Sequence, residues 1–348
     1  RPTPRPSRRQ RQMCIRDRLS SVLDADIRSV AVADAHEGTT GRGVLSLDAA
    51  PDAGLPSSLF VKLPPGDEAQ RAFVVSSGMG RREALFYQQL AGEVPVRVPR
   101  CFHADTDDPG EHYIMLLEPL QESGCTFRNA STRYSLEYLQ AMMAQFALLH
   151  AAYWDTPRFD TDLAWLEPPR QHPIGVSLVE RALSTHGAAQ PPVFRELAEL
   201  YLSHTDAVHA LWNRGVPTLV HGDAHDGNLF MDADTPGFLD WALVARAPAM
   251  RDVGYFLAAT LRPEDRGHLL PLVDNYRDGL LAAGVTPPSQ RDLQEQFRWH
   301  AVYVWVGTVV TLAMGDAWQP AEYIQATLAR LQDTLAAEDC AGALRAGL

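Results

Sequence analysis

The segment LVHGDAHDGNLF, residues 219–230, places two His, two Asp and one Asn between two apolar stretches. Three interpretations compete for it: a solvated surface turn, a metal site and a catalytic loop. The flanking residues "TLV" and "NLF" have the apolar character of buried strands. Loops that are held between rigid elements commonly carry functional groups. The pattern therefore favours a functional loop over a surface turn.

A metal site in this region would draw on His221, Asp223, His225, Asp226 and Asp240. The two His have the i, i+4 spacing that zinc hydrolases use on a helix. However, Gly222 and Gly227 and the absence of helical periodicity make the segment a poor helix. A zinc hydrolase is therefore the weaker alternative, and stoichiometric zinc together with an ATP-independent activity would distinguish it.

The same segment meets the requirements of phosphoryl transfer. That reaction needs a carboxylate that orients and deprotonates the acceptor hydroxyl, an Asn and a second Asp that hold Mg²⁺, and a Lys near the phosphates. Asp223 and Asn228 have the spacing of the kinase catalytic loop H-R-D-x-x-x-x-N. Asp240 follows within "FLDW". Oxygen ligands of this kind suit Mg²⁺ better than zinc.

Lys62 is the only lysine among the 31 Lys and Arg residues of the chain. Lys is a compact point charge on a flexible stem, whereas Arg is a wide planar fork. The apolar segment "LFVKLP" (59–64) is typical of a strand, and a Lys that projects from a strand is suited to a nucleotide phosphate. Chance retention of a surface Lys is the open alternative.

Together these motifs resemble the aminoglycoside phosphotransferase and choline kinase superfamily, whose signature is HGDxxxxN followed by a hydrophobic residue, Asp and Trp. The segments "LLHAAYW" (148–154), "DVGYFLAATLRPEDR" (252–266) and "YRDGLLAAGV" (276–285) are most similar to the ecdysteroid kinase-like branch and its bacterial relatives. The resemblance spans about residues 25–340. It implies an α+β, bilobal protein-kinase-like fold with a small β-rich N-lobe and a larger, mainly helical C-lobe.

The resemblance also implies roles for individual residues. Asp223 would be the catalytic base, and His221 would shape the loop around it. Asn228 and Asp240 would bind Mg²⁺. Lys62 would contact the phosphates of ATP.

Further residues of the nucleotide site follow from the same resemblance. Glu83 would orient the lysine, although a solvated helical Glu is the alternative. Backbone groups from Leu117 through Glu118 to Pro119 would meet adenine. The segment "HEGTTGRG" (36–43) would cover the phosphates through Gly38, Gly41 and Gly43. Asp252 would brace the catalytic loop, unless it is an ordinary helix N-cap.

Patterning along the chain predicts three parts: a disordered basic tail (1–18), an N-terminal nucleotide-binding lobe (19–120) and a C-terminal catalytic and acceptor-binding lobe (121–348). In the N-lobe we expect strands at 27–35, 44–49, 59–64 and 112–120 and one helix over 70–92. In the C-lobe we expect a hairpin at 228–241 and helices at 135–151, 175–187, 193–213, 252–260, 266–283, 290–314 and 320–338.

Composition limits the partners. Residues 1–18 contain seven Arg and one Asp, which leaves a net charge of −18 on residues 19–348, against −12 for the whole chain. We expect that this tail is foreign to the natural protein, and a basic nucleic-acid arm is the alternative. The acidic body argues against nucleic-acid and anionic-membrane partners. Four scattered Cys indicate a reducing cytoplasm, and no obligate protein partner is implied.

These observations predict an ATP- and Mg²⁺-dependent small-molecule kinase that moves the γ-phosphate to a hydroxyl group. A nucleotide-binding pseudokinase or scaffold is the alternative. Aromatic side chains are the candidate walls of the acceptor site: Trp154, Trp299 and Tyr303 first, then Tyr153, Trp165 and Trp305. The sequence leaves a quaternary ammonium, a lipophilic alcohol and a polycationic sugar open as acceptors.

Overall fold

The computed structural model describes the chain except for residues 1–7, 38–39, 128–133, 170, 172 and 316–320. The contacts divide it into two compact units. Unit 1 comprises residues 1–93 and 98–126, and unit 2 comprises residues 94–97 and 127–348. The division after residue 126 lies a few residues beyond the boundary that we predicted near residue 120.

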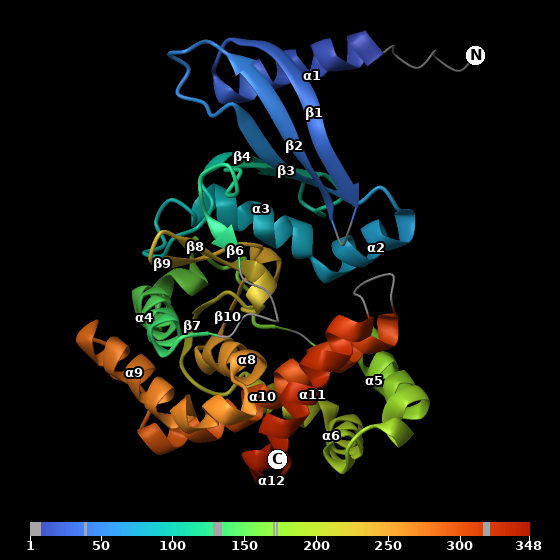
Figure 1. The fold of residues 1–348 in the computed structure, drawn as a ribbon, viewed down its shortest axis with the longest axis vertical. Coiled ribbons are helices and arrows are strands. Elements are labelled where there is room, and N and C mark those ends of the chain that lie inside the picture. The colour runs from blue at the N-terminus through green and yellow to red at the C-terminus, as the bar shows by residue number, and fades with distance from the viewer. Residues whose placement is uncertain (1–7, 38–39, 128–133, 170, 172, 316–320) are drawn as a thin grey trace. The chain divides into compact units, whose positions relative to one another are not determined.

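Unit 1 contains a five-stranded antiparallel sheet with the order β1-β2-β3-β5-β4 (Figure 1). Its strands are β1 (Ile27–Glu37), β2 (Gly41–Ala49), β3 (Ser58–Leu63), β4 (Cys101–Thr106) and β5 (Tyr113–Leu117). The strands that we predicted at 44–49 and 59–64 correspond to β2 and β3, which pair antiparallel. Lys62 lies opposite Arg42 on one side and Met115 on the other, so it occupies a central strand. Strand β4 was not predicted.

We predicted a single helix over residues 70–92, and this prediction is wrong. Two helices, α2 (Glu68–Ser77) and α3 (Met79–Gln89), occupy the range instead. Gly78 separates them with a φ of 70°. Such a left-handed conformation caps one helix and prevents its continuation, and glycine adopts it without steric cost.

The N-terminal segment also differs from our expectation of disorder, because α1 (Arg8–Leu23) includes residues 8–18. Arg, Gln, Met and Leu are good helix formers, and the segment has no Pro after residue 6. Leu19 is buried in a cluster with Ile27, Leu59 and Leu116. This contact ties the end of α1 to the sheet.

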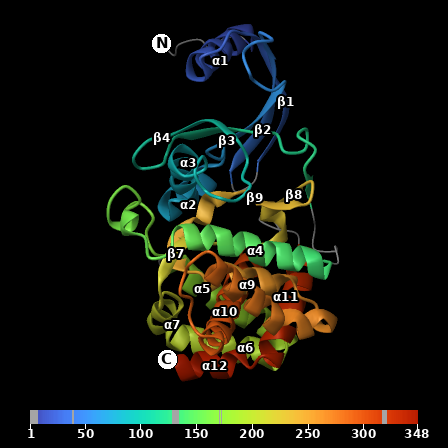
Figure 2. The same cartoon turned by 90° about the vertical axis from the view of Figure 1, so that its left-hand side faces the viewer.

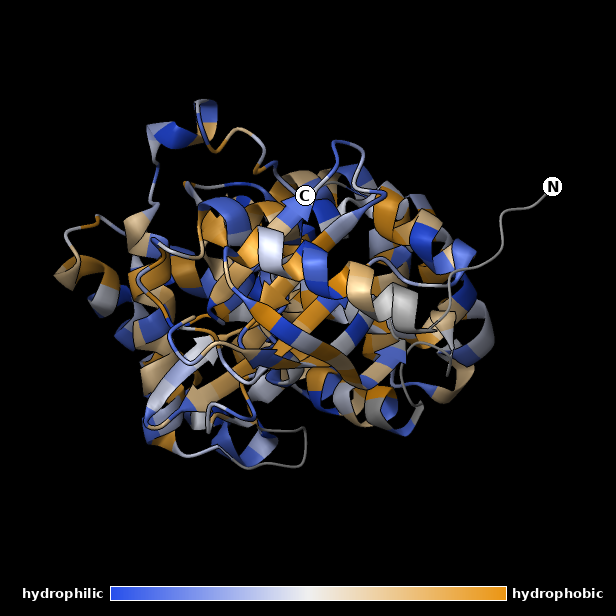
Figure 3. Ribbon diagram, turned by 90° about the horizontal axis from the view of Figure 1, so that it is seen from above, coloured by the Kyte–Doolittle hydropathy of each residue, from blue (hydrophilic) through white to orange (hydrophobic). Residues whose placement is uncertain are grey.

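Unit 2 is mainly helical. Its helices are α4 (Leu136–Ala152), α5 (Pro173–His186), α6 (Pro192–Ser203), α7 (Thr205–Trp212), α8 (Met250–Thr260), α9 (Leu269–Ala282), α10 (Gln290–Met314), α11 (Ala321–Ala337) and α12 (Cys340–Gly347). Helix α10 is central, since it contacts α5, α7, α8, α9, α11 and α12. Helix α4 packs on α9 (Figure 2). Orange and blue segments alternate along the helices in Figure 3, as in amphipathic helices with one buried face.

Most of the predicted helices of unit 2 are confirmed, with two exceptions. The range 193–213 forms two helices, α6 and α7, because His204 between them has non-helical backbone angles (φ −135°, ψ 32°). Helix α12 was not predicted. Of the described residues, no helix has the length and apolar character that a membrane crossing requires.

Short strands carry the polar motif. β7 (Pro217–Val220) pairs with β10 (Ala245–Pro248), and β8 (Leu229–Asp232) pairs with β9 (Thr235–Phe238) in a sheet that also includes β6 (Thr126–Phe127). The predicted hairpin at 228–241 is therefore confirmed. The polar residues 221–228 lie between β7 and β8, in a loop held at both ends by buried strands.

Candidate active site

The loop that follows β7 turns sharply at Gly222, which has a φ of 85°. A Cβ atom at this position would lie 2.3 Å from the carbonyl oxygen of Leu243. Only glycine therefore fits both the backbone angle and the close approach. The turn leaves Asp223 partly exposed, with 29% of its side chain accessible, while His221 before it is buried.

Asp252, in the first turn of α8, binds the backbone of this loop through both oxygens of its carboxylate. Its Oδ2 accepts the N–H of His221 at 2.6 Å, and its Oδ1 accepts the N–H of Gly222 at 2.8 Å. The carboxyl group is fully buried. Burial favours a raised pKa for Asp252, but the hydrogen bond and charge of His150 and the N–H of Gly222 together lower its pKa. The carboxylate is thus the form that binds the loop.

His150, on α4, and Tyr276, on α9, extend the network away from the loop. His150 Nε2 lies 3.3 Å from Asp252 Oδ2, and its Nδ1 lies 2.9 Å from the Tyr276 hydroxyl. Both side chains are fully buried. Burial, and next the charge of Asp252, raise the pKa of Tyr276 well above its usual value. The tyrosine therefore stays a neutral hydroxyl, and one connected set of hydrogen bonds joins α4, α8, α9 and the loop.

His221 links two segments of the site. Its Nδ1 accepts the backbone N–H of Asp223 at 3.2 Å, and its Nε2 donates to the carbonyl oxygen of Leu239 at 2.9 Å. These contacts require a lone pair on Nδ1 and a proton on Nε2. The imidazole thereby connects the base of the loop to the residue that precedes Asp240.

Asn228 and Asp240 are brought to the same loop. The Asn228 amide donates to the backbone oxygen of Asp223 at 2.9 Å and to its Oδ2 at 3.0 Å. The N–H of Leu239 donates to the carbonyl oxygen of Asn228 at 2.9 Å. Asp240 itself has a φ of 63°, a left-handed conformation that costs a non-glycine residue about 1 kcal/mol. Strain of this kind is common at functional sites.

Lys62 and Glu83 form a buried ion pair in unit 1. Lys62 Nζ lies 2.6 Å and 2.7 Å from the two carboxylate oxygens of Glu83. Strand β3 provides the lysine and helix α3 the glutamate. The exposed fraction of Lys62 is 4% and that of Glu83 is 0%. Glu83 is therefore not a solvated helical residue, and Lys62 is not a surface lysine.

The other described residues that we expect at the nucleotide site lie on strands of unit 1 or directly after one. Gly41 and Gly43 lie within β2, and a Cβ atom at Gly43 would come within 2.9 Å of the Asp34 carbonyl oxygen. Gly38 lies outside the described residues. Leu117 ends β5, and the N–H of Glu118 donates to the Arg100 carbonyl oxygen at 2.8 Å. The close approach of strand β1 to β2 therefore explains why position 43 is a glycine, without any contact to a nucleotide.

Of the aromatic candidates for the acceptor site, Tyr303 contacts the catalytic loop. Tyr303 donates its hydroxyl to the carbonyl oxygen of Gly222 at 3.4 Å, so it lies against the loop. Trp299 is buried and donates to the Ala343 carbonyl oxygen at 3.2 Å. Trp305 is buried against Phe194. The remaining three differ in burial, since Tyr153 is buried and Trp154 and Trp165 are partly exposed.

Two residues in or near the loop, His225 and Tyr255, were not predicted as acceptor contacts. His225 Nε2 lies 3.7 Å from Asp223 Oδ2. The ring of Tyr255 lies 6.5 Å from that of His225 and 6.2 Å, edge to face, from that of Tyr303. Tyr255 follows Asp252 by three residues, and residues at that helical spacing share one face. The spacing between Asp252 and Tyr255 could therefore have identified Tyr255 from the sequence.

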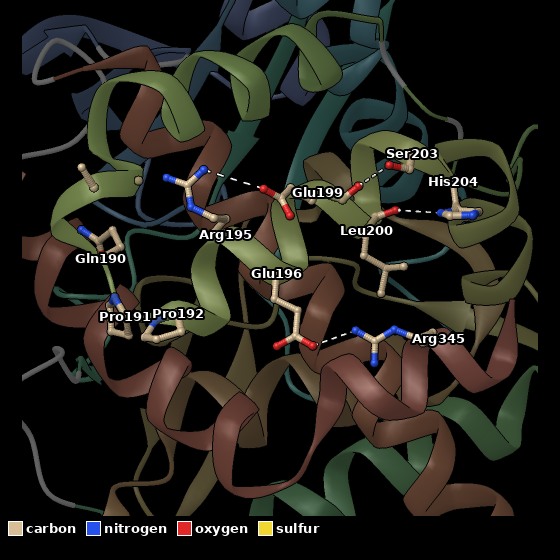
Figure 4. A pocket seen from close by; sticks show the side chains of 12 residues that line it. Gln190, Pro191, Pro192, Arg195, Glu196, Glu199, Leu200, Ser203, His204 and Arg345 are labelled. Atoms are coloured by element: carbon tan, nitrogen blue, oxygen red, sulfur yellow. Dashed lines mark hydrogen bonds and ion pairs between the residues drawn. The ribbon is translucent and has the colours of Figure 1, made fainter.

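A separate hollow of about 690 Å³ lies beside α6 (Figure 4). Its walls include two ion pairs, between Arg345 and Glu196 and between Arg195 and Glu199. None of the residues predicted for the nucleotide, the metal or the acceptor lines it. The hollow is therefore separate from the loop chemistry.

Residues 51–293 match the model of the phosphotransferase enzyme family. No curated protein matches the chain. Among solved structures, the GDP complex of aminoglycoside 2′-phosphotransferase-IIIa is 15% identical, with 94% of this chain and 99% of that chain covered and a TM-score of 0.54. The GDP and kanamycin complex of APH(2″)-IIIa gives the same identity and coverage with a TM-score of 0.56.

Choline kinase from Cryptosporidium parvum is 14% identical, with 89% of this chain and 90% of that chain covered and a TM-score of 0.50. These similarities confirm the predicted superfamily and its α+β, protein-kinase-like fold. They also confirm the prediction of a small-molecule kinase. The chain therefore belongs to the phosphotransferase enzyme family.

Proposed function

We propose that this enzyme transfers the γ-phosphate of ATP to a hydroxyl group of a small molecule, in a Mg²⁺-dependent reaction with Asp223 as the catalytic base. The observation that carries the proposal is the Asn228 amide, which donates to both the backbone and the carboxylate of Asp223. This arrangement fixes the carboxylate while leaving it partly exposed. A positioned carboxylate of this kind can accept the proton of an attacking hydroxyl.

The residues present fit a magnesium ion. Because the amide nitrogen of Asn228 is used in the loop, its Oδ1 atom remains as a ligand, and the Asp240 carboxylate provides further oxygens. In the described part of the chain, no group of three or more His, Cys, Asp or Glu side chains could hold a metal ion by itself. Two protein ligands, with the remainder from water and phosphate, suit Mg²⁺ in a nucleotide site. When bound, Mg²⁺ neutralises charge on the phosphates.

The Lys62–Glu83 pair supports a role in nucleotide binding. A buried Lys that is bound to a carboxylate has a fixed position, and an ammonium group is a point charge that suits a phosphate. In unit 1 we assign contact with the phosphates to Lys62, and we assign orientation of this lysine to Glu83. We further assign the glycine-containing segment 36–43 to cover the phosphates and the backbone of residues 117–119 to contact adenine. The use of ATP rather than GTP is part of the proposal.

His225, Tyr255 and Tyr303 are the residues that we assign to the acceptor site, because they lie beside Asp223 and its loop. Three expectations remain predictions. They are the cytoplasmic location, the independence from nucleic acid, membranes and an obligate protein partner, and the similarity to the ecdysteroid kinase-like branch. The relatives named above include a kanamycin complex and a choline kinase, so aminoglycosides and amino alcohols belong among the acceptors to be tested.

The test is ADP release from ATP and Mg²⁺, measured with a panel of amino alcohols, aminoglycosides, macrolides and sterol-like alcohols. We expect one class to stimulate ADP release, and we expect this stimulation to disappear in Asp223→Ala. Asp234→Asn, in the exposed turn between β8 and β9, is the matched control. Nucleotide binding without stimulation by any member of the panel would contradict the proposal and favour the pseudokinase or scaffold alternative.

A further inference from the structure

Arg251, in the first turn of α8, is a buried cation whose charge has no carboxylate partner. Its exposed fraction is 1%. Its Nε and Nη1 atoms lack a hydrogen-bond partner, and it takes part in no ion pair in the described part of the chain. The adjacent Asp252 does not serve it, because both oxygens of that carboxylate bind the catalytic loop. A buried charge without a counter-charge is strongly unfavourable.

The contact that Arg251 does make is with an aromatic ring. Its guanidinium carbon lies 4.1 Å from the centre of the Tyr303 ring, in a cation–π arrangement. Such an interaction is weaker than the cost of burying an unpaired charge. It also leaves the in-plane donors of the guanidinium unused, because those N–H bonds point along the plane of the group.

His300, on α10, provides further unused polar atoms close by. It is fully buried, and neither ring nitrogen has a partner in the described structure. Helices α8 and α10 approach closely here, since a Cβ atom at Gly254 would come within 2.9 Å of His300 Cβ. Burial, and next the charge of Arg251, lower the pKa of His300 well below its usual value. His300 is therefore neutral, with one N–H to donate.

We propose that Arg251 Nε and Nη1, together with the His300 N–H, bind a small monovalent anion in the seam between α8 and α10. The anion is a halide or a small carboxylate, because either accepts several N–H donors at once. Water would satisfy the donors but would not neutralise the guanidinium. The site also has a connection to the loop: Tyr303, which covers Arg251, donates to the carbonyl oxygen of Gly222. The anion would therefore stabilise the catalytic loop through Tyr303.

The test compares thermal unfolding of the full chain, dialysed free of halide, in sodium gluconate, chloride and formate at equal ionic strength. Gluconate is too large for the seam and is the reference. We expect chloride, formate or both to raise the apparent Tm by about 3 °C or more. We expect Arg251→Met to lose this shift and Arg277→Met, a partly buried Arg on α9, to keep it.

Crystals of the wild-type chain grown in bromide provide a measurement that does not depend on a variant. If the anion is a halide, we expect an anomalous peak within hydrogen-bond distance of Arg251 and His300. A shift with chloride alone would assign a halide, and a shift with formate alone, with formate density in the seam, would assign a carboxylate. Equal Tm in all three salts, or a shift that Arg251→Met retains, would overturn the proposal.

Discussion

Replacing Asp252 with Asn tests how much the catalytic loop depends on the buried carboxylate. The native side chain accepts the N–H groups of His221 at 2.6 Å and Gly222 at 2.8 Å, and His150 Nε2 lies 3.3 Å from it. An Asn side chain has one acceptor oxygen and one NH₂ group of the same shape. In its least costly orientation the NH₂ group replaces Oδ1 and faces the Gly222 N–H. One bond to a charged acceptor, worth about 1.5–3 kcal/mol, is then lost.

The bonds that remain are also weakened, because bonds to an ionised acceptor are roughly twice as strong as neutral ones. We therefore expect Asp252→Asn to lower the free energy of unfolding by about 3 kcal/mol. A displacement of the loop by about 1 Å would lower kcat by about 100-fold. Urea unfolding and acceptor-dependent ADP release measure the two effects.

The control is Asp339→Asn. Asp339 is exposed and accepts the N–H of Gly342 at 3.2 Å at the start of α12. Asn is as good an N-cap as Asp, so this change should cost less than about 0.5 kcal/mol. Equal small costs for the two variants would refute the reasoning, because burial of the Asp252 carboxylate would then confer no particular stability on the loop.

Three further predictions concern the network and the nucleotide site. Because the pKa of Asp252 is lowered in the folded protein, its contribution to stability is present above the unfolded pKa of about 3.9 and is lost as pH falls through the folded value. The wild-type advantage over Asp252→Asn in urea should therefore shrink below about pH 4, and a constant advantage would contradict this. Gly222→Ala should lower the free energy of unfolding by more than about 2 kcal/mol, because the φ of 85° and the contact with Leu243 both exclude a Cβ atom; wild-type urea stability would refute it. Glu83→Gln removes the carboxylate charge beside the buried Lys62 and should cost about 3–5 kcal/mol and raise the KM for ATP, whereas an unchanged KM would separate the ion pair from nucleotide binding.

Much of the fold could be predicted because local patterns determine it. The apolar strands around Lys62 and the hairpin after Asn228 have a periodicity that needs no tertiary information. Gly78 ended a helix that periodicity alone would have continued. Residues 8–18 form a helix where composition indicated disorder, and the packing of Leu19 on the sheet fixes its end. That contact joins distant segments, so local composition does not reveal it.

Part of the candidate site could likewise be predicted from local sequence, and part depends on contacts between distant segments. Spacing alone associated Asp223, Asn228 and Asp240, because they share one short segment of chain. His150 binds Asp252 across 102 positions, and nothing in "LLHAAYW" identifies that partner. Likewise, the helical spacing of Trp299 and Tyr303 did not distinguish a core residue from one beside the loop. Only the packing of α10 makes that distinction.

Transfer of the γ-phosphate from radiolabelled ATP to the acceptor that the panel identifies measures the proposed reaction itself. Wild type, Asp223→Asn and the control Asp234→Asn would be compared, with nucleotide binding measured separately by equilibrium titration. We predict that Asp223→Asn lowers the transfer rate by about 100-fold to 10,000-fold, as loss of a general base does, with the Kd for ATP nearly unchanged. Transfer by Asp223→Asn at a rate close to that of the wild type would show that Asp223 is not the catalytic base.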